Sequence, residues 1–249
     1  MRAILTYHSI DPSGSAISTD TATFRRQIEW LAGSDVPVVS VDALLAMEDV
    51  EEGVALTFDD AFENFGSVAW PLLRDRGLPA TVFVVSDHVG GSNDWGGREE
   101  PGIPTLPLLG WDDLGRLAEQ GVTVGSHTRT HPRLAGLEPD RLQDEVEGSA
   151  AAIERELGKR PNGFAYPYGS VDGASAGTVE GAYAWACTTE LAAVEAEDSR
   201  HRLPRLDAYY FRDAGRLEAW GSARFRVRLA VRRVLRRARA RLVEGAGAV

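Results

Sequence analysis

The chain has 249 residues, of which 43% are hydrophobic and 26% charged, and its net charge at pH 7 is −10. These values are typical of a globular protein with a hydrophobic core, built as one large domain or two small ones. The single cysteine, Cys187, excludes an internal disulfide. The chain contains no run of 18 apolar residues, so no transmembrane helix is predicted. Its first apolar run is too short for a signal peptide. We therefore expect a cytoplasmic protein.

The charge is unevenly distributed along the chain. From residue 212 onward there are 11 arginines and three acidic residues, a local net charge of +8, so the first 211 residues carry −18. An acidic body with a basic tail is poorly suited to nucleic acid as its main ligand. We expect no nucleic-acid partner, and we divide the chain into a domain over 1–211 and a basic tail over 212–249.

Short β-rich segments alternate with helix-like segments from the first residues onward. Apolar residues recur at helical spacing between the β-rich segments, as in Phe24, Ile28 and Leu31. This alternation predicts an α/β fold with a parallel sheet and helices outside it, either open or closed into a barrel. The predicted strands are Ala3–Tyr7, Val36–Val41, Val54–Phe58, Ala80–Val85, Val122–Gly125, Gly163–Tyr166 and Tyr183–Thr188.

Two further segments each allow two interpretations. The Gly- and Pro-rich segment 90–107 is either part of a binding site or a plain surface loop. Residues 217–242 predict a basic amphipathic helix, which either packs on the acidic body or lies peripherally on anionic lipid at the inner membrane face. Its apolar stripe is Val227, Val231, Leu235, Ala238 and Leu242, and its flanking arginines are Arg224, Arg228, Arg232, Arg236 and Arg239.

Three polar motifs follow predicted strands, at the end where α/β proteins place reacting groups. Asp59 and Asp60 end the stretch VALTFDD, His127 and His131 lie in SHTRTH, and Tyr168 lies in AYPYG. The two aspartates alone could form a solvated acidic turn. Two histidines four residues apart plus one carboxylate are a ligand set for a divalent metal, with room left for water and substrate. A second carboxylate beside such a metal could then act as a base.

These motifs, in this order and spacing, resemble the polysaccharide deacetylase family with the NodB homology domain (carbohydrate esterase family 4), over residues 5–206. The resemblance implies a distorted (β/α) barrel of about seven parallel strands. It also implies removal of acetyl groups from N-acetylated sugars with zinc or a similar dication, such as Co²⁺ or Ni²⁺. By the same resemblance, Asp59 is the general base, and Asp60, His127 and His131 hold the metal. The backbone N–H of Tyr168 would stabilise the oxyanion.

The chain departs from the family pattern at two positions. Ala165 stands where many members have an arginine, and Arg205 either orients Asp59 in its place or forms a surface ion pair. The late Leu-x-His motif of many members, which supplies the general acid, is absent. The early Tyr7-His8 pair matches a branch resembling the poly-N-acetylglucosamine deacetylases, so we assign the acid to His8 before His201. A histidine satisfied by neighbouring backbone is the alternative for His8, and His88 is interpreted as structural.

We therefore predict a metal-dependent N-deacetylase that acts on a glycan or glycoconjugate containing N-acetylhexosamine. An O-acetyl esterase on acetylated sugars would use the same site with an easier leaving group. A catalytically inactive glycan-binding scaffold is a third interpretation, against which the complete set of Asp59, Asp60, His127 and His131 argues. The sequence predicts neither the sugar, its length, nor the oligomeric state.

Overall fold

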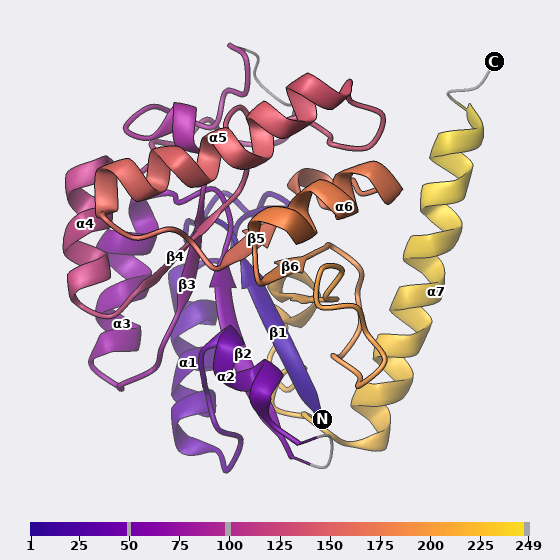
Figure 1. The fold of residues 1–249 in the computed structure, drawn as a ribbon. Coiled ribbons are helices and arrows are strands. Elements are labelled where there is room, and N and C mark those ends of the chain that lie inside the picture. The colour runs from indigo at the N-terminus through magenta and orange to yellow at the C-terminus, as the bar shows by residue number, and fades with distance from the viewer. Residues whose placement is uncertain (49–50, 98–100, 247–249) are drawn as a thin grey trace.

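The computed structural model describes residues 1–48, 51–97 and 101–246, without the side chains of 236–246. Seven parallel strands form one sheet in the order β6-β5-β4-β3-β2-β1-β7, with helices around it (Figure 1). The strands are β1 (Arg2–Tyr7), β2 (Gly53–Phe58), β3 (Thr81–Val84), β4 (Thr123–Ser126), β5 (Gly163–Ala165), β6 (Trp185–Cys187) and β7 (Leu206–Asp207). The helices are α1 (Thr21–Gly33), α2 (Val41–Ala46), α3 (Trp70–Arg74), α4 (Trp111–Glu119), α5 (Pro139–Leu157), α6 (Gly173–Ala182) and α7 (Ala223–Ala246).

One short segment connects the two edges of the sheet. Leu203 forms a parallel bridge with Cys187 of β6, and three residues later Leu206 pairs with Leu5 of β1. The sheet therefore curls round on itself, and the predicted distorted (β/α) barrel of seven parallel strands is confirmed. Because Arg205 lies between Leu203 and Leu206, the same segment brings its side chain to the barrel interior.

The predicted strand Val36–Val41 is wrong. Ser40 caps a helix by accepting a hydrogen bond from the Ala43 backbone, so α2 begins at Val41. Only Val38 bridges to Val54 of β2, and Pro37 has no N–H to extend a ladder. The seventh strand is β7, whose two residues are too few for a periodicity signal.

The predicted C-terminal helix begins later than Leu217. Gly221 has a positive φ of 69°, and Ser222 Oγ accepts a hydrogen bond from the Phe225 backbone, so that α7 starts at Ala223. Leu217 and Phe225 are buried in the same cluster as β1 and β2 residues. The domain boundary at residue 212 stays a prediction.

Alternation along β1 and β2 decides which side chains enter the barrel. Leu5 and Leu56 belong to the cluster that packs against the outer helices, whereas Ile4 and Ala55 belong to the inner cluster. Successive strand residues point to opposite faces, so Thr57, and then Asp59 just beyond β2, follow Ala55 on the inner side. The sequence period of two therefore aims the Asp59 carboxylate into the barrel.

Candidate active site

The carboxyl ends of the strands gather most of the predicted site residues at one edge of the barrel. His8 follows β1, Asp59 and Asp60 follow β2, and His127 follows β4. His131 lies four residues after His127, and Tyr168 follows β5. Because the strands are parallel, their carboxyl ends lie at the same edge, and segments far apart in the sequence meet there.

Asp60, His127 and His131 converge on one point. Asp60 Oδ1 lies 3.5 Å from His127 Nε2 and 3.4 Å from His131 Nε2, and three ligand atoms of this buried group lie within 4.8 Å of one another. Asp60 Oδ1 is fully buried and has no hydrogen-bond partner among the described residues. Leaving such an oxygen unpaired is costly, and a cation would satisfy it. Two imidazole nitrogens and one carboxylate oxygen fit a divalent ion such as zinc.

Outer partners direct both histidine rings toward this point. His127 Nδ1 lies 2.6 Å from the Ala165 carbonyl oxygen, which can only accept, so this nitrogen carries the proton and Nε2 is left as the ligand atom. His131 Nδ1 lies 3.2 Å from the Tyr168 hydroxyl. Burial, and after it His127, lowers the pKa of His131 well below its ordinary value. A neutral ring is the form that binds a metal.

Arg205 forms a bidentate ion pair with Asp59 inside the barrel. Its Nη1 and Nη2 atoms donate to the two Asp59 oxygens at 2.6 and 2.7 Å, and its side chain is only 1% exposed. Nη1 also lies 3.0 Å from Thr6 Oγ1, and Nε donates to the Thr188 carbonyl oxygen. Burial raises the pKa of Asp59, but the charge and hydrogen bonds of Arg205 outweigh burial and hold this pKa below its usual range. Asp59 is thus ionised and oriented, and a surface ion pair does not describe Arg205.

The structure places only one of the two candidate acids beside Asp59. His8 Nε2 lies 3.7 Å from Asp59 Oδ2, and the His8 side chain is partly exposed. His201 Nε2 instead lies 2.9 Å from the carbonyl oxygen of Tyr183. Tyr183 precedes β6 and is therefore at the amino-terminal end of the strand, away from the edge that carries the metal ligands. The geometry favours His8 for contact with a substrate at Asp59.

The backbone around this edge is strained. Five non-glycine residues of the described chain have positive φ, namely Asp60 (69°), Ala61 (56°), Thr128 (71°), His131 (61°) and Tyr168 (58°). Such conformations cost on the order of 1–3 kcal/mol each and persist where the surroundings enforce them. All five lie in the three loops that carry the Asp60, histidine and Tyr168 motifs.

Glu145, which the sequence did not single out, supports the histidine loop. It is buried on α5 and accepts hydrogen bonds of 2.9 Å from the backbone N–H groups of Arg129 and Thr130. These two residues lie between His127 and His131, so Glu145 stabilises the turn that separates the ligands. The sequence signal that could have indicated Glu145 is an acidic residue at a helix position whose neighbours in the helical pattern are apolar.

Trp95 is a second residue that sequence reasoning missed. It lies in segment 90–107, and its ring stacks on His131 with a centroid distance of 4.3 Å and an interplanar angle of 28°. Tyr168 also contacts His131: the two rings meet edge-on with a centroid distance of 4.7 Å. Residues 98–100 of this segment lie outside the described part. The described part of the segment reaches the candidate site and is more than a plain surface loop.

Comparison with known proteins points to one family. A family model described as polysaccharide deacetylase matches residues 47–182. The chain is 25% identical to the Bacillus subtilis protein YxkH over 209 residues, which are 82% of this chain and 70% of that protein. It is 23% identical to a poly-beta-1,6-N-acetyl-D-glucosamine N-deacetylase of Staphylococcus epidermidis over 197 residues, 74% of this chain and 65% of the relative. The fold matches IcaB from Ammonifex degensii with a TM-score of 0.70 at 20% identity, over 84% of this chain and 93% of IcaB.

Proposed function

Because this chain belongs to the polysaccharide deacetylase family, we propose that it hydrolyses the acetamide of an N-acetylhexosamine-containing glycan or glycoconjugate and releases acetate. The observation that carries the proposal is the buried, unpaired Asp60 Oδ1 between two histidine Nε2 atoms, with the Asp59 carboxylate on the adjacent residue. The named activity of the Staphylococcus epidermidis relative supports a polymer of N-acetylglucosamine as the substrate class.

Asp60, His127 and His131 would hold a divalent metal, with Zn²⁺ first and Co²⁺ or Ni²⁺ as alternatives. When bound, the ion supplies Lewis acidity toward the acetamide oxygen and toward water. Asp59, ionised and oriented by Arg205, accepts a proton from the attacking water as a new C–O bond forms. Arg205 does not react and acts by positioning Asp59.

Two further groups complete the reaction. The Tyr168 backbone, held at φ 58°, presents its N–H as a donor for the oxyanion that develops on the acetyl carbonyl. His8 donates a proton to the amine nitrogen as the C–N bond breaks, which leaves acetate and a free amino sugar. The partial exposure of His8 suits a group that must meet a substrate from solution.

Acetate release from matched substrates tests the proposal. We expect purified protein loaded with Zn²⁺ to release acetate from oligomers of N-acetylglucosamine, and to lose this activity with a chelator. Amino-sugar formation in equal amount to acetate would identify the broken bond as C–N. Acetate release from O-acetylated sugars alone would replace the proposal with an esterase, and no release from either substrate, with metal bound, would favour the inactive scaffold.

His8→Ala is expected to lower kcat on the acetamide by about 10²–10⁴-fold, because protonation of the departing nitrogen is lost. Metal content should not change, since His8 is not one of the three clustered ligands. His201→Ala is the matched control, and we expect it to keep kcat within a few-fold. Steady-state kinetics with both variants decides the assignment: a slow His201 variant beside a normal His8 variant would reverse it.

A further inference from the structure

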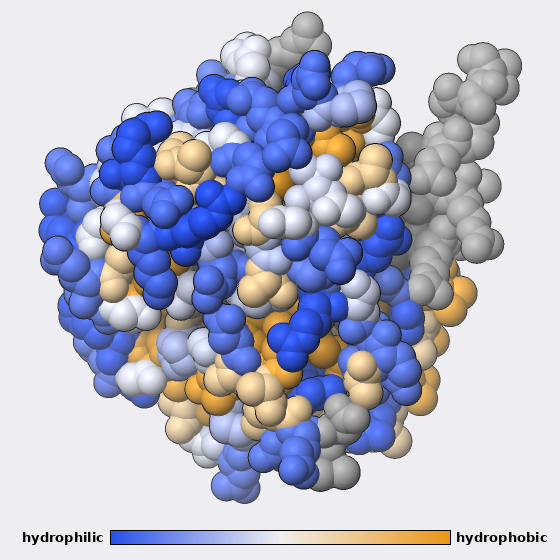
Figure 2. Space-filling view, viewed as in Figure 1, coloured by the Kyte–Doolittle hydropathy of each residue, from blue (hydrophilic) through white to orange (hydrophobic). Residues whose placement is uncertain are grey.

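Helix α7 turns an apolar stripe away from the protein. Val227, Val231 and Leu235, which we call the outer stripe, are 63%, 52% and 59% exposed, and Val234 beside them is 65% exposed. Their spacing of four residues places the three side chains on one face of the helix. Figure 2 shows hydrophobic surface along the described part of α7, at the right-hand edge of the view.

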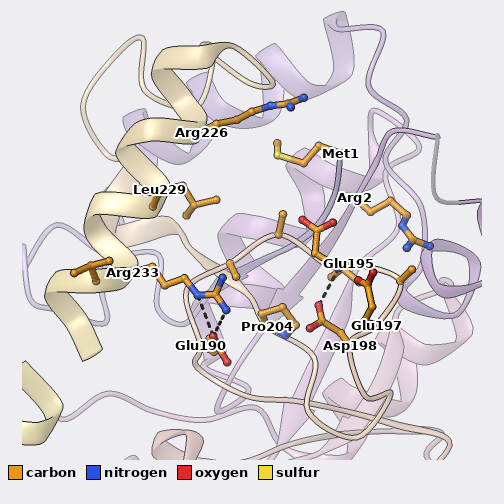
Figure 3. Close-up of a pocket in the computed structure, with 16 residues that line it drawn as sticks. Met1, Arg2, Glu190, Glu195, Glu197, Asp198, Pro204, Arg226, Leu229 and Arg233 are labelled. Atoms are coloured by element: carbon orange, nitrogen blue, oxygen red, sulfur yellow. Dashed lines mark hydrogen bonds and ion pairs between the residues drawn. The ribbon is translucent and has the colours of Figure 1, made fainter. Parts of the chain in front are cut away.

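A different face of α7 attaches the helix to the body. Phe225 is buried against Phe211 with stacked rings 5.4 Å apart, and Leu229 packs against the same cluster. Arg233 donates to Glu190 at 2.6 Å. In Figure 3, Leu229 and Arg233 point from α7 toward the segment that holds Glu190 and Pro204, and together with Arg226 they line a cavity of about 750 Å³. The helix is thus held without use of the outer stripe, so in the described part the stripe does not pack on the acidic body.

The charge beside the outer stripe is of one sign. Arg224, Arg228 and Arg232 border it, and the sequence between Glu218 and Glu244 holds nine arginines and no acidic residue. In the sequence, the same pattern of apolar and basic residues continues with Ala238, Leu242, Arg236 and Arg239, whose side chains lie outside the described part. Apolar side chains bordered by arginines match the boundary between the acyl chains and the anionic headgroups of a lipid leaflet.

We propose that the outer stripe of α7 docks this protein on the surface of an anionic lipid bilayer. No helix in the described part of the chain is long and apolar enough to cross a membrane, so α7 would lie in the interface plane. A second copy bound through the same face would bring two sets of arginines together, which like-charge repulsion opposes. Nucleic acid would pair with the arginines but would leave the exposed valines and leucine in water. The acidic body, repelled by the same lipid, favours an orientation with α7 toward the bilayer.

Flotation of the full-length protein with vesicles tests this proposal. We expect the protein to float with vesicles of 70% phosphatidylcholine and 30% phosphatidylglycerol, and to float at least tenfold less with phosphatidylcholine alone. The triple variant V227S/V231S/L235S should lose at least tenfold of the binding and keep the thermal unfolding midpoint, because all three side chains are already exposed. No binding of the wild type to anionic vesicles at low salt, or undiminished binding of the triple variant, would overturn the proposal.

Two charge reversals on the same helix test the orientation. Arg224 borders the outer stripe, whereas Arg226 lines the cavity on the other side of α7, and both are exposed. Arg224→Glu should weaken flotation more than Arg226→Glu, although the net charge changes equally. Equal weakening would contradict docking through the outer stripe. A concentration-dependent dimer that the triple variant abolishes would assign the stripe to a second copy and overturn the lipid proposal.

Discussion

Asp59→Asn is expected to lower kcat for acetate release by about 10²–10⁴-fold while the metal stays bound. The amide has nearly the same size as the carboxylate but does not accept the proton of the attacking water. Asp59 is not one of the three clustered ligands, so its loss leaves Asp60, His127 and His131 in place. Steady-state kinetics and elemental analysis of the same preparation measure the two effects.

The stability of this variant must be measured as a control, because Asp59 is one partner of a buried ion pair with Arg205. Removing one partner of such a pair costs about 3–5 kcal/mol in the free energy of unfolding. Arg205 would keep its hydrogen bonds to Thr6 and the Thr188 carbonyl, so we expect a folded variant. Kinetics must be measured below the unfolding transition of the variant. Normal turnover by folded Asp59→Asn protein would remove Asp59 from the role of base.

His127→Ala is expected to abolish both metal binding and turnover. Wild-type protein should contain about one zinc, cobalt or nickel ion per chain, and the variant less than a tenth of that amount. His127 supplies one of the three converging atoms, and its loss leaves two protein ligands where a catalytic zinc normally has three. Elemental analysis after reconstitution and dialysis measures the occupancy.

His88→Ala is the matched control for the metal measurement. His88 meets the Trp95 ring edge-on at 5.0 Å and is not one of the clustered ligands, so we expect its removal to leave the metal content unchanged. A wild-type protein without metal, even after reconstitution, would make Asp59 and Asp60 an acidic turn and favour a binding scaffold. Metal retained by His127→Ala would exclude His127 as a required ligand.

Two sequence patterns predicted most of the barrel: the continuous apolar runs of the buried strands, and the helical spacing of apolar residues between them. Six of the seven predicted strands overlap β1–β6. The wrong strand, Val36–Val41, has the same β-branched composition, but one side-chain hydrogen bond from Ser40 was enough to begin α2. The missed strand, β7, is a strand only because it pairs with β1, and local composition does not reveal such a pairing.

The sequence by itself determined the order of the motifs, because each lies directly after its own strand and every strand is parallel. It therefore predicted that Asp59, Asp60, His127, His131, Tyr168 and His8 share one edge. Only the tertiary structure decided that Arg205 reaches Asp59 from 146 residues away, that Trp95 stacks on His131, and that His201 bonds at the opposite end of β6. It also decided which face of α7 is left in solvent. These features depend on barrel closure and side-chain packing, which join residues distant in sequence and leave no periodic pattern along the chain.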